Sequence, residues 1–172
     1  FTNLNNVTFY NIGNKGASYG KLVPIQFTSQ IAPLAAELNA RDEKEKLSRL
    51  FVNTTKFLNS ISIPIFVFLF VFAEVFIFAW MGSGYVVSSL ILRILAAGYM
   101  VNFMFSVPGN LIIPNLGIPK FQMYEGLIYL SVNIVLSYLL IINYGITGAA
   151  IGNSISAIIA ATLAILAYVS GN

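Results

Sequence analysis

The sequence contains no cysteine and no histidine, and charged residues are scarce. Without cysteine there can be no disulfide, no thiolate metal ligand and no cysteine nucleophile. Without histidine the chain lacks the commonest general base and the commonest ligand of transition metals. Charged residues make up 9% of the 172 positions, whereas an ordinary soluble domain carries about 25%. Because so little charge is available to cover a water-facing surface, the composition predicts an integral membrane protein.

Apolar residues take the place of the missing charge. They make up 58% of the chain, and the mean hydropathy is +0.82, which excludes a disordered protein. Nine basic and six acidic residues give a net charge of +3, and the basic residues border apolar runs. Nucleic-acid binding needs a basic face, so we expect the lipid bilayer and not nucleic acid as a partner. The sequence starts at Phe1 without a signal peptide, and we expect a fragment of a longer protein.

The apolar runs set the predicted fold. A transmembrane helix needs about 20 predominantly apolar residues, and four segments meet this requirement. A weaker fifth segment, residues 22–38, holds Pro24, Pro33, Gln26 and Gln30, which suits a helix facing protein or a water-filled cavity. We therefore predict an all-α integral membrane protein, an antiparallel bundle of about five transmembrane helices. The predicted helices cover residues 17–39, 42–80 with an amphipathic start, 85–113, 120–142 and 146–169.

The amphipathic start, residues 41–58, opens with the charged run RDEKEK and continues with apolar residues at helical spacing. Its acidic residues complement the dipole at a helix N-terminus, and Asp42/Lys46 and Glu45/Arg49 are favourable i,i+4 pairs. Two interpretations stay open with equal weight. The segment is either an amphipathic helix on the membrane surface or a solvated connector.

The basic residues also predict the orientation. If the spans alternate in direction, six of the basic residues fall on one side and Lys15 and Lys21 on the other. The side richer in Lys and Arg is cytoplasmic, which predicts a multi-pass protein of the cytoplasmic membrane. The six residues on that side are Arg41, Lys44, Lys46, Arg49, Lys56 and Lys120.

Two charges fall inside the predicted spans. Arg93 lies eight residues beyond Tyr85, about 12 Å along a helix, and Glu74 lies six residues before Trp80, about 9 Å along the preceding one. Consecutive antiparallel spans place the two at similar depth. Arg93 is therefore either a cation that binds a lipid phosphate in a translocation cavity or a partner of Glu74 in an ion pair that joins two helices. The ion pair is the favoured interpretation for Glu74.

The remaining polar residues have less specific interpretations. Lys21 offers a second cation at the mouth of the 22–38 helix, although extension of its side chain to the interface is the simpler explanation. For the amides within the spans, hydrogen bonds between helices are favoured over contacts to a sugar. Gly148 and Gly152 are interpreted as a close helix-packing face, because their spacing does not fit a nucleotide-binding loop. The amides are Asn102, Asn110, Asn133 and Asn153.

The sequence contains no recognisable set of catalytic residues. The sequence has no P-loop and no metal-ligand cluster, and it has no closely spaced carboxylate pair outside the charged run RDEKEK. We expect no enzyme activity, no metal and no cofactor.

Several segments resemble, in order along the chain, motifs of the polysaccharide exporters and O-antigen flippases. These proteins belong to the multidrug/oligosaccharidyl-lipid/polysaccharide exporter superfamily. The similar segments are VTFYNIG at residues 7–13, residues 26–38 with Pro33, the charged linker 41–49, WMGSGY at 80–85, and Asn133 followed by NYGITGAAI at 143–151.

The resemblance implies a fold and a function. Family members have two bundles of six helices, so the chain would form about the last five helices of the second bundle, and the first bundle would be a missing partner. The implied cargo is an undecaprenyl-diphosphate-linked oligosaccharide, moved to the outer leaflet by alternating access. It is a precursor of O-antigen, capsule, exopolysaccharide or teichoic acid. The cations of the family's cavity carry over to Arg93 and Lys21.

Two alternatives remain. The first is a cation-coupled multidrug exporter of the same superfamily, for which Glu74 would be the coupling carboxylate. It ranks lower because Glu74 is the only deep acid in the predicted spans. The second is a non-transporting membrane scaffold for glycan synthesis, which needs neither a polar 22–38 helix nor Arg93.

Overall fold

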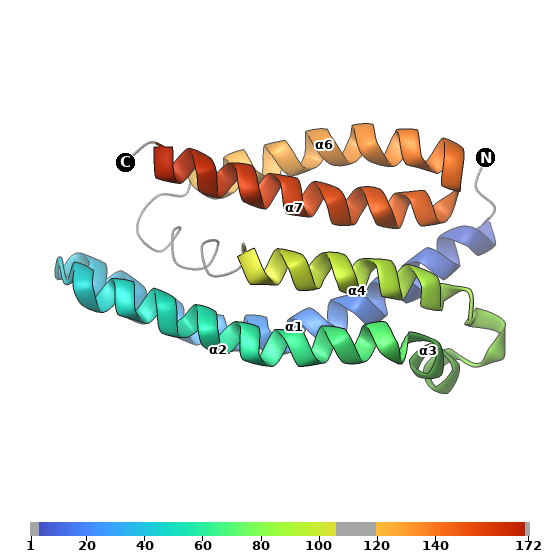
Figure 1. Cartoon of the computed structure of the whole chain (residues 1–172), viewed down its shortest axis with the longest axis horizontal. Helices are drawn as coiled ribbons and strands as arrows, with labels where there is room; N and C mark the ends of the chain where they lie inside the picture. Colours follow the sequence, from blue (N-terminus) through green and yellow to red (C-terminus); the bar gives the residue numbers. More distant parts are fainter. Residues whose placement is uncertain (1–3, 106–119, 171–172) are drawn as a thin grey trace.

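The computed structural model describes residues 4–105 and 120–170, and the chain is entirely helical or turn within those residues. Figure 1 shows long helices that run back and forth along one axis. The elements are α1 (Leu4–Ala40), α2 (Lys44–Val71), α3 (Ala73–Met81), the short 3-10 helix η1 (Ser83–Tyr85), α4 (Ser88–Phe105), α6 (Lys120–Tyr144) and α7 (Ile146–Ser170).

Successive long helices alternate in direction. The junction of α1 and α2, the start of α6 and the C-terminal end of α7 lie at the left end of Figure 1. The segment of α3 and η1 and the turn between α6 and α7 lie at the right end. The helix termini that are predicted to be cytoplasmic from their basic residues therefore lie together at one end of the molecule. We call it the basic end, and the other the α3 end.

Within the described residues, two helices are long and apolar enough to cross a membrane, Lys44–Val71 and Met123–Tyr144. The described apolar stretches of α4 and α7 are shorter, Ser88–Met104 and Ile146–Ala160. The polar residues of α1 lower its hydropathy below that of a lipid-facing span. The all-helical class is thus established for the described residues, and the crossing by five helices remains a prediction.

Helix α4 is the centre of the packing, with α1, α2 and α7 around it. Its buried Ile91, Leu92 and Leu95 belong to one apolar cluster with Phe66 and Leu69 of α2. Helix α1 approaches α4 closely at Gly13. A Cβ atom there would lie 2.8 Å from Cγ2 of Ile91 and 2.9 Å from the Ser88 carbonyl oxygen.

Helices α6 and α7 form a tight hairpin. Gly145 turns the chain with φ of 59°, a conformation that glycine adopts at little cost. A Cβ at Gly148 would lie 2.2 Å from the Leu140 carbonyl oxygen, and one at Gly152 would lie 2.7 Å from Oγ of Ser137. The predicted packing face of Gly148 and Gly152 is confirmed, because only glycine fits at these contacts.

Some helix boundaries differ from those expected. Helix α1 begins at Leu4 and not near residue 17, because Tyr10 and Asn14 find hydrogen-bond partners on other helices. The expected helix 42–80 is divided at Phe72, and no glycine or proline stands there to explain the break. The expected helix 85–113 extends into residues 106–119, which lie outside the described residues.

The amphipathic start of α2 packs against α1. Thr54 and Leu58 are buried, and the ring of Phe57 meets that of Phe27 of α1 edge to face, with centroids 5.4 Å apart. The predicted pair of Glu45 and Arg49 forms, with 2.6 Å between Oε1 and Nη2.

The predicted pair of Asp42 and Lys46 does not form. Asp42 precedes the helix in a left-handed conformation, with φ of 55°, and its carboxylate lies 3.5 Å from Nζ of Lys44. Aspartate is one of the few residues that tolerate this conformation.

Candidate functional site

One face of α1 is exposed along its length, and most of its side chains are polar. Its residues recur three or four positions apart, so they share one side of the helix. We call this surface the polar face of α1. It consists of Thr8, Asn11, Lys15, Tyr19, Leu22, Gln26, Gln30, Pro33 and Glu37.

The polar face of α1 contrasts with the exposed face of α6. There the exposed residues include Met123, Leu127, Leu130, Ile134 and Leu139, all apolar. Hydrocarbon suits the face of α6, but it cannot hydrogen-bond the amides of α1. Water or further protein is the environment that the polar face of α1 requires.

The opposite side of α1 carries a second row of polar residues, Tyr10, Asn14 and Lys21, directed toward the other helices. The hydroxyl of Tyr99 on α4 donates a hydrogen bond of 3.1 Å to Oδ1 of Asn14. Nζ of Lys21 lies 3.6 Å from the centroid of the Tyr99 ring, the arrangement of a cation–π interaction. Lys21 is thus half-buried between α1 and α4 and does not lie on the polar face.

Asn153 extends this row to α6 and α7. Its Oδ1 accepts a 3.1 Å hydrogen bond from the hydroxyl of Tyr129, and its Nδ2 donates one of 3.1 Å to the hydroxyl of Tyr10. The amide therefore joins α6, α7 and α1. The contacts form two groups along this side of α1, Tyr10 with Tyr129 and Asn153, and Asn14 with Lys21 and Tyr99, and we call the six residues together the polar seam.

A second amide also joins two helices. Nδ2 of Asn102 donates a 3.1 Å hydrogen bond to the carbonyl oxygen of Ala157. The interpretation of the amides as interhelical hydrogen-bonding groups is confirmed for Asn102 and Asn153. Asn110 lies outside the described residues.

Arg93 and Glu74 lie beside each other. Nη2 of Arg93 is 3.9 Å from Oε2 of Glu74, and the side chains are 38% and 61% exposed. The distance exceeds that of a hydrogen bond, so the pair is loose and partly accessible. The predicted depth match between the two helices is therefore present, without the tight geometry of a buried ion pair.

Arg93 also lines a shallow, open groove of about 480 Å³ between α4 and α7, with Phe70 of α2 at its edge. We call it the Arg93 groove. The lining residues of α4 all lie on one side of that helix. Its other sides carry Ile91, Leu92 and Tyr99, which face α1 and the core. The lining comprises Phe70, Leu90, Arg93, Ile94, Ala97, Gly98, Val101, Ile151, Ser154, Ile155 and Ile158.

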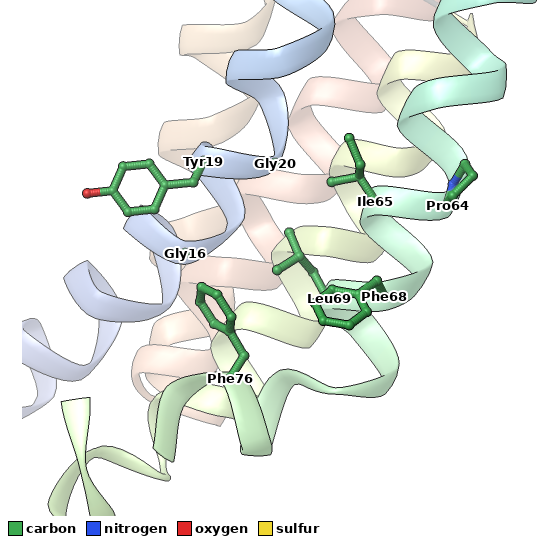
Figure 2. Close-up of a pocket in the computed structure, with 8 residues that line it drawn as sticks. All are labelled: Gly16, Tyr19, Gly20, Pro64, Ile65, Phe68, Leu69 and Phe76. Atoms are coloured by element: carbon green, nitrogen blue, oxygen red, sulfur yellow. The ribbon is translucent and has the colours of Figure 1, made fainter. Parts of the chain in front are cut away.

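A second hollow, of about 390 Å³, lies between α1, α2 and α3 where Gly16 and Gly20 leave room. Figure 2 shows Phe76 extending from α3 toward Gly16, and Tyr19 with its hydroxyl directed away from the other labelled side chains. None of the described residues that line this hollow is charged. Its walls offer hydrocarbon and aromatic surface, so it carries no polar chemistry.

Comparison of the chain with protein-family models, curated proteins and solved structures finds no match. Among residues 4–105 and 120–170, no group of three histidine, cysteine, aspartate or glutamate residues could hold a metal ion. The surfaces with chemistry to offer are therefore the polar face of α1, the polar seam and the Arg93 groove.

Residues 22–38 were expected to face protein or water, and Asn153 to bond between helices, but the first half of the polar face of α1 and the other members of the polar seam were not predicted from the sequence. The polar face of α1 and the row of Tyr10, Asn14 and Lys21 begin before residue 17, where the first helix was expected to start. Their spacings, three and four for the face and four and seven for the row, are the signal that extension of the helix to residue 4 would have provided. The partners of Tyr99 lie on α1, with Asn14 85 residues earlier in the chain, so no local pattern indicates them.

Proposed function

We propose that the chain is part of a multi-pass transporter of the cytoplasmic membrane that moves an undecaprenyl-diphosphate-linked oligosaccharide outward by alternating access. The polar face of α1 carries this proposal, since Asn11, Lys15 and Gln30 require water or polar protein beside them, and a water-filled cavity supplies it. A transporter with a second helical bundle would enclose that cavity against α1. The order of exporter-like motifs along the chain supports the same function.

The chemistry of the polar face suits such a cargo. Asn11 and Gln30 can donate hydrogen bonds to sugar hydroxyls and accept hydrogen bonds from them. Lys15 supplies the cation that a diphosphate needs. The cation-coupled drug exporter is less favoured, because Glu74, the acid it would use, lies beside Arg93 and not on the polar face of α1.

Cysteine accessibility tests the cavity. The sequence contains no cysteine, so single variants such as Asn11→Cys and Gln30→Cys can be labelled alone. In membranes open to a charged maleimide on both sides, both should react rapidly because water surrounds them. Leu130→Cys and Ile134→Cys on α6 are the matched controls, exposed but facing lipid. Equal labelling on the two helices would contradict the cavity.

A transport assay tests the cargo. Expressed from its complete gene, a Lys15→Gln variant should restore surface glycan poorly in a strain that lacks its lipid-linked oligosaccharide flippase. Arg49→Gln is the control, because it removes an exposed cation on α2, away from the polar face of α1. Arg93→Ala and Lys21→Gln test the two cations first expected to bind the cargo. Normal glycan export by the Lys15 variant would remove that residue from the mechanism, and failure of the unaltered protein to export any glycan would favour the scaffold.

A further inference from the structure

The Arg93 groove combines a cation with a long apolar channel. On α4 its lining residues recur at helical spacing from Leu90 to Val101, and on α7 from Ile151 to Ile158. The channel along α4 is about 16 Å long, from the rise of 1.5 Å per residue. Apart from Arg93 and Ser154, its lining is hydrocarbon, and the Ser154 hydroxyl is engaged with the Ile94 carbonyl oxygen at 3.3 Å. Arg93 lines the groove with the hydrocarbon part of its side chain, and its guanidinium lies at the edge of the groove beside Glu74.

The guanidinium of Arg93 is available to a stronger partner. Glu74 approaches it only to 3.9 Å, beyond hydrogen-bond distance, and 61% of the Glu74 side chain is exposed. A guanidinium offers five N–H donors in a fork that matches phosphate oxygens. An anion of that geometry can form bonds to Arg93 that Glu74 does not form.

The direction of the groove agrees with a lipid of one leaflet. Arg93 lies near the α3 end of α4, and the apolar lining continues from it toward Val101, deeper along the helix. Side chains on a helix point toward its N-terminus, so the guanidinium is directed toward the α3 end. A molecule with its anionic head at Arg93 would extend its hydrocarbon chain toward the middle of the bundle. The basic residues predict that the α3 end faces outward.

We propose that the Arg93 groove binds an anionic phospholipid of the outward-facing leaflet, with its phosphate on Arg93 and one acyl chain along the open groove where α4 and α7 meet. The exposed rim of the groove favours a bilayer lipid as the occupant. Phe70, Leu90 and Ile155 are exposed apolar residues there, and the polar face of α1 belongs to another helix that does not line the groove. The lipid is thus a bound partner and not the transported cargo.

Lipid retention measures this binding. The full-length protein is purified with a mixture of phosphatidylglycerol and phosphatidylcholine of identical acyl chains, and the bound lipid is counted by native mass spectrometry. We expect retention of phosphatidylglycerol about tenfold above phosphatidylcholine, from charge-assisted bonds to Arg93. Arg93→Gln should abolish this preference. Equal retention of the two lipids by the unaltered protein would overturn the proposal.

Two further variants separate the site from a structural ion pair. Glu74→Gln removes the competing carboxylate, so retention of phosphatidylglycerol should rise, whereas a purely structural pair would lose stability and gain no lipid. Ile155→Trp fills the channel and should lower retention of both lipids. Ile134→Trp on α6 is its control, since it adds the same ring to an exposed apolar position outside the groove.

Two competitors identify the occupant. Inorganic phosphate at millimolar concentration should not displace the lipid, because it lacks the chain that the groove holds. Displacement by phosphate alone, or retention of undecaprenyl phosphate in place of phosphatidylglycerol, would overturn the proposal. Neither result affects the labelling test of α1, so this proposal and the transport function can fail separately.

Discussion

Replacement of Gly98 by alanine should drive α4 and α7 apart. A Cβ atom at Gly98 would lie 2.3 Å from Cβ and from Oγ of Ser154, and 3.0 Å from its Cα. Carbon atoms in contact are ordinarily separated by about 3.5 Å or more. The two helices must therefore move by roughly 1.2 Å at this point, the difference between about 3.5 Å and 2.3 Å.

The cost of this movement follows from what it disturbs. Overpacking of a well-packed contact costs about 1–3 kcal/mol. The hydrogen bond from Oγ of Ser154 to the Ile94 carbonyl oxygen is already 3.3 Å long and would be lost, adding about 0.6 kcal/mol in a membrane protein. We expect Gly98→Ala to lower the free energy of unfolding by about 2 kcal/mol.

Equilibrium unfolding in mixed detergent micelles, followed by circular dichroism, measures this change. Gly126→Ala on α6 is the matched control, because a Cβ added there would meet no described neighbour within 4 Å and alanine favours the helix by up to about 1 kcal/mol. Gly98→Ala combined with Ser154→Gly should recover part of the lost stability, because the second change removes Cβ and Oγ of Ser154. The recovery is only partial, since Cα at position 154 still lies 3.0 Å from the added Cβ. A Gly98→Ala protein as stable as the Gly126→Ala protein would refute the close contact of α4 and α7.

The polar seam makes two further predictions, tested by the same unfolding measurement. Asn153→Leu removes an amide that donates to one tyrosine and accepts from another, so the free energy of unfolding should fall by about 1 kcal/mol. An unchanged stability would show that the amide is not shared between helices. Tyr99→Phe keeps the ring beneath Lys21 and loses the hydroxyl that bonds to Asn14 and Ser18, at about 0.6 kcal/mol for each bond. Tyr99→Leu also removes the cation–π contact and should cost about 1 kcal/mol more. Equal stability of the Phe and Leu variants would contradict that contact.

The sequence predicts helices α6 and α7 well because their signals are local. Continuous apolar residues define both helices, and the expected ranges 120–142 and 146–169 end within two residues of Lys120–Tyr144 and Ile146–Ser170. Gly145, with its positive φ, marks the turn between them. Gly148 and Gly152 indicate the tight contact directly, since small residues four apart allow backbones to approach.

The first half of α1 escapes prediction for the opposite reason. A search for apolar runs detects helices that face lipid, and the early residues of α1 are rich in asparagine, lysine and glycine. Their hydrogen-bond partners lie far along the chain: Asn14 is 85 residues from Tyr99, and Tyr10 is 143 residues from Asn153. The register between packed helices is a tertiary property, so no local pattern could indicate which tyrosine meets which amide.

The two cations expected to act alike differ because of the faces on which they lie. Lys21 follows Asn14 by seven residues, so it shares the inward side of α1 and packs on Tyr99. Arg93 lies on the side of α4 that faces neither α1 nor the core, at the edge of a groove. The sequence places Arg93 inside a predicted span and Lys21 at the mouth of one, but it does not give the rotation of either helix. That rotation separates a cation that stabilises packing from one that is accessible to a ligand.

The two sides of α1 together suit this helix to line a transport path. Its inner side is held to α4 and α7 by the polar seam and by the close approach at Gly13, so α1 cannot turn its amides inward without breaking those contacts. The polar face of α1 therefore stays exposed on the described chain, along a helix that spans the length of the bundle. Because lipid cannot satisfy Asn11 or Gln30, a membrane-embedded protein must place water or another polar surface beside them, and a path for a hydrophilic cargo requires the same condition.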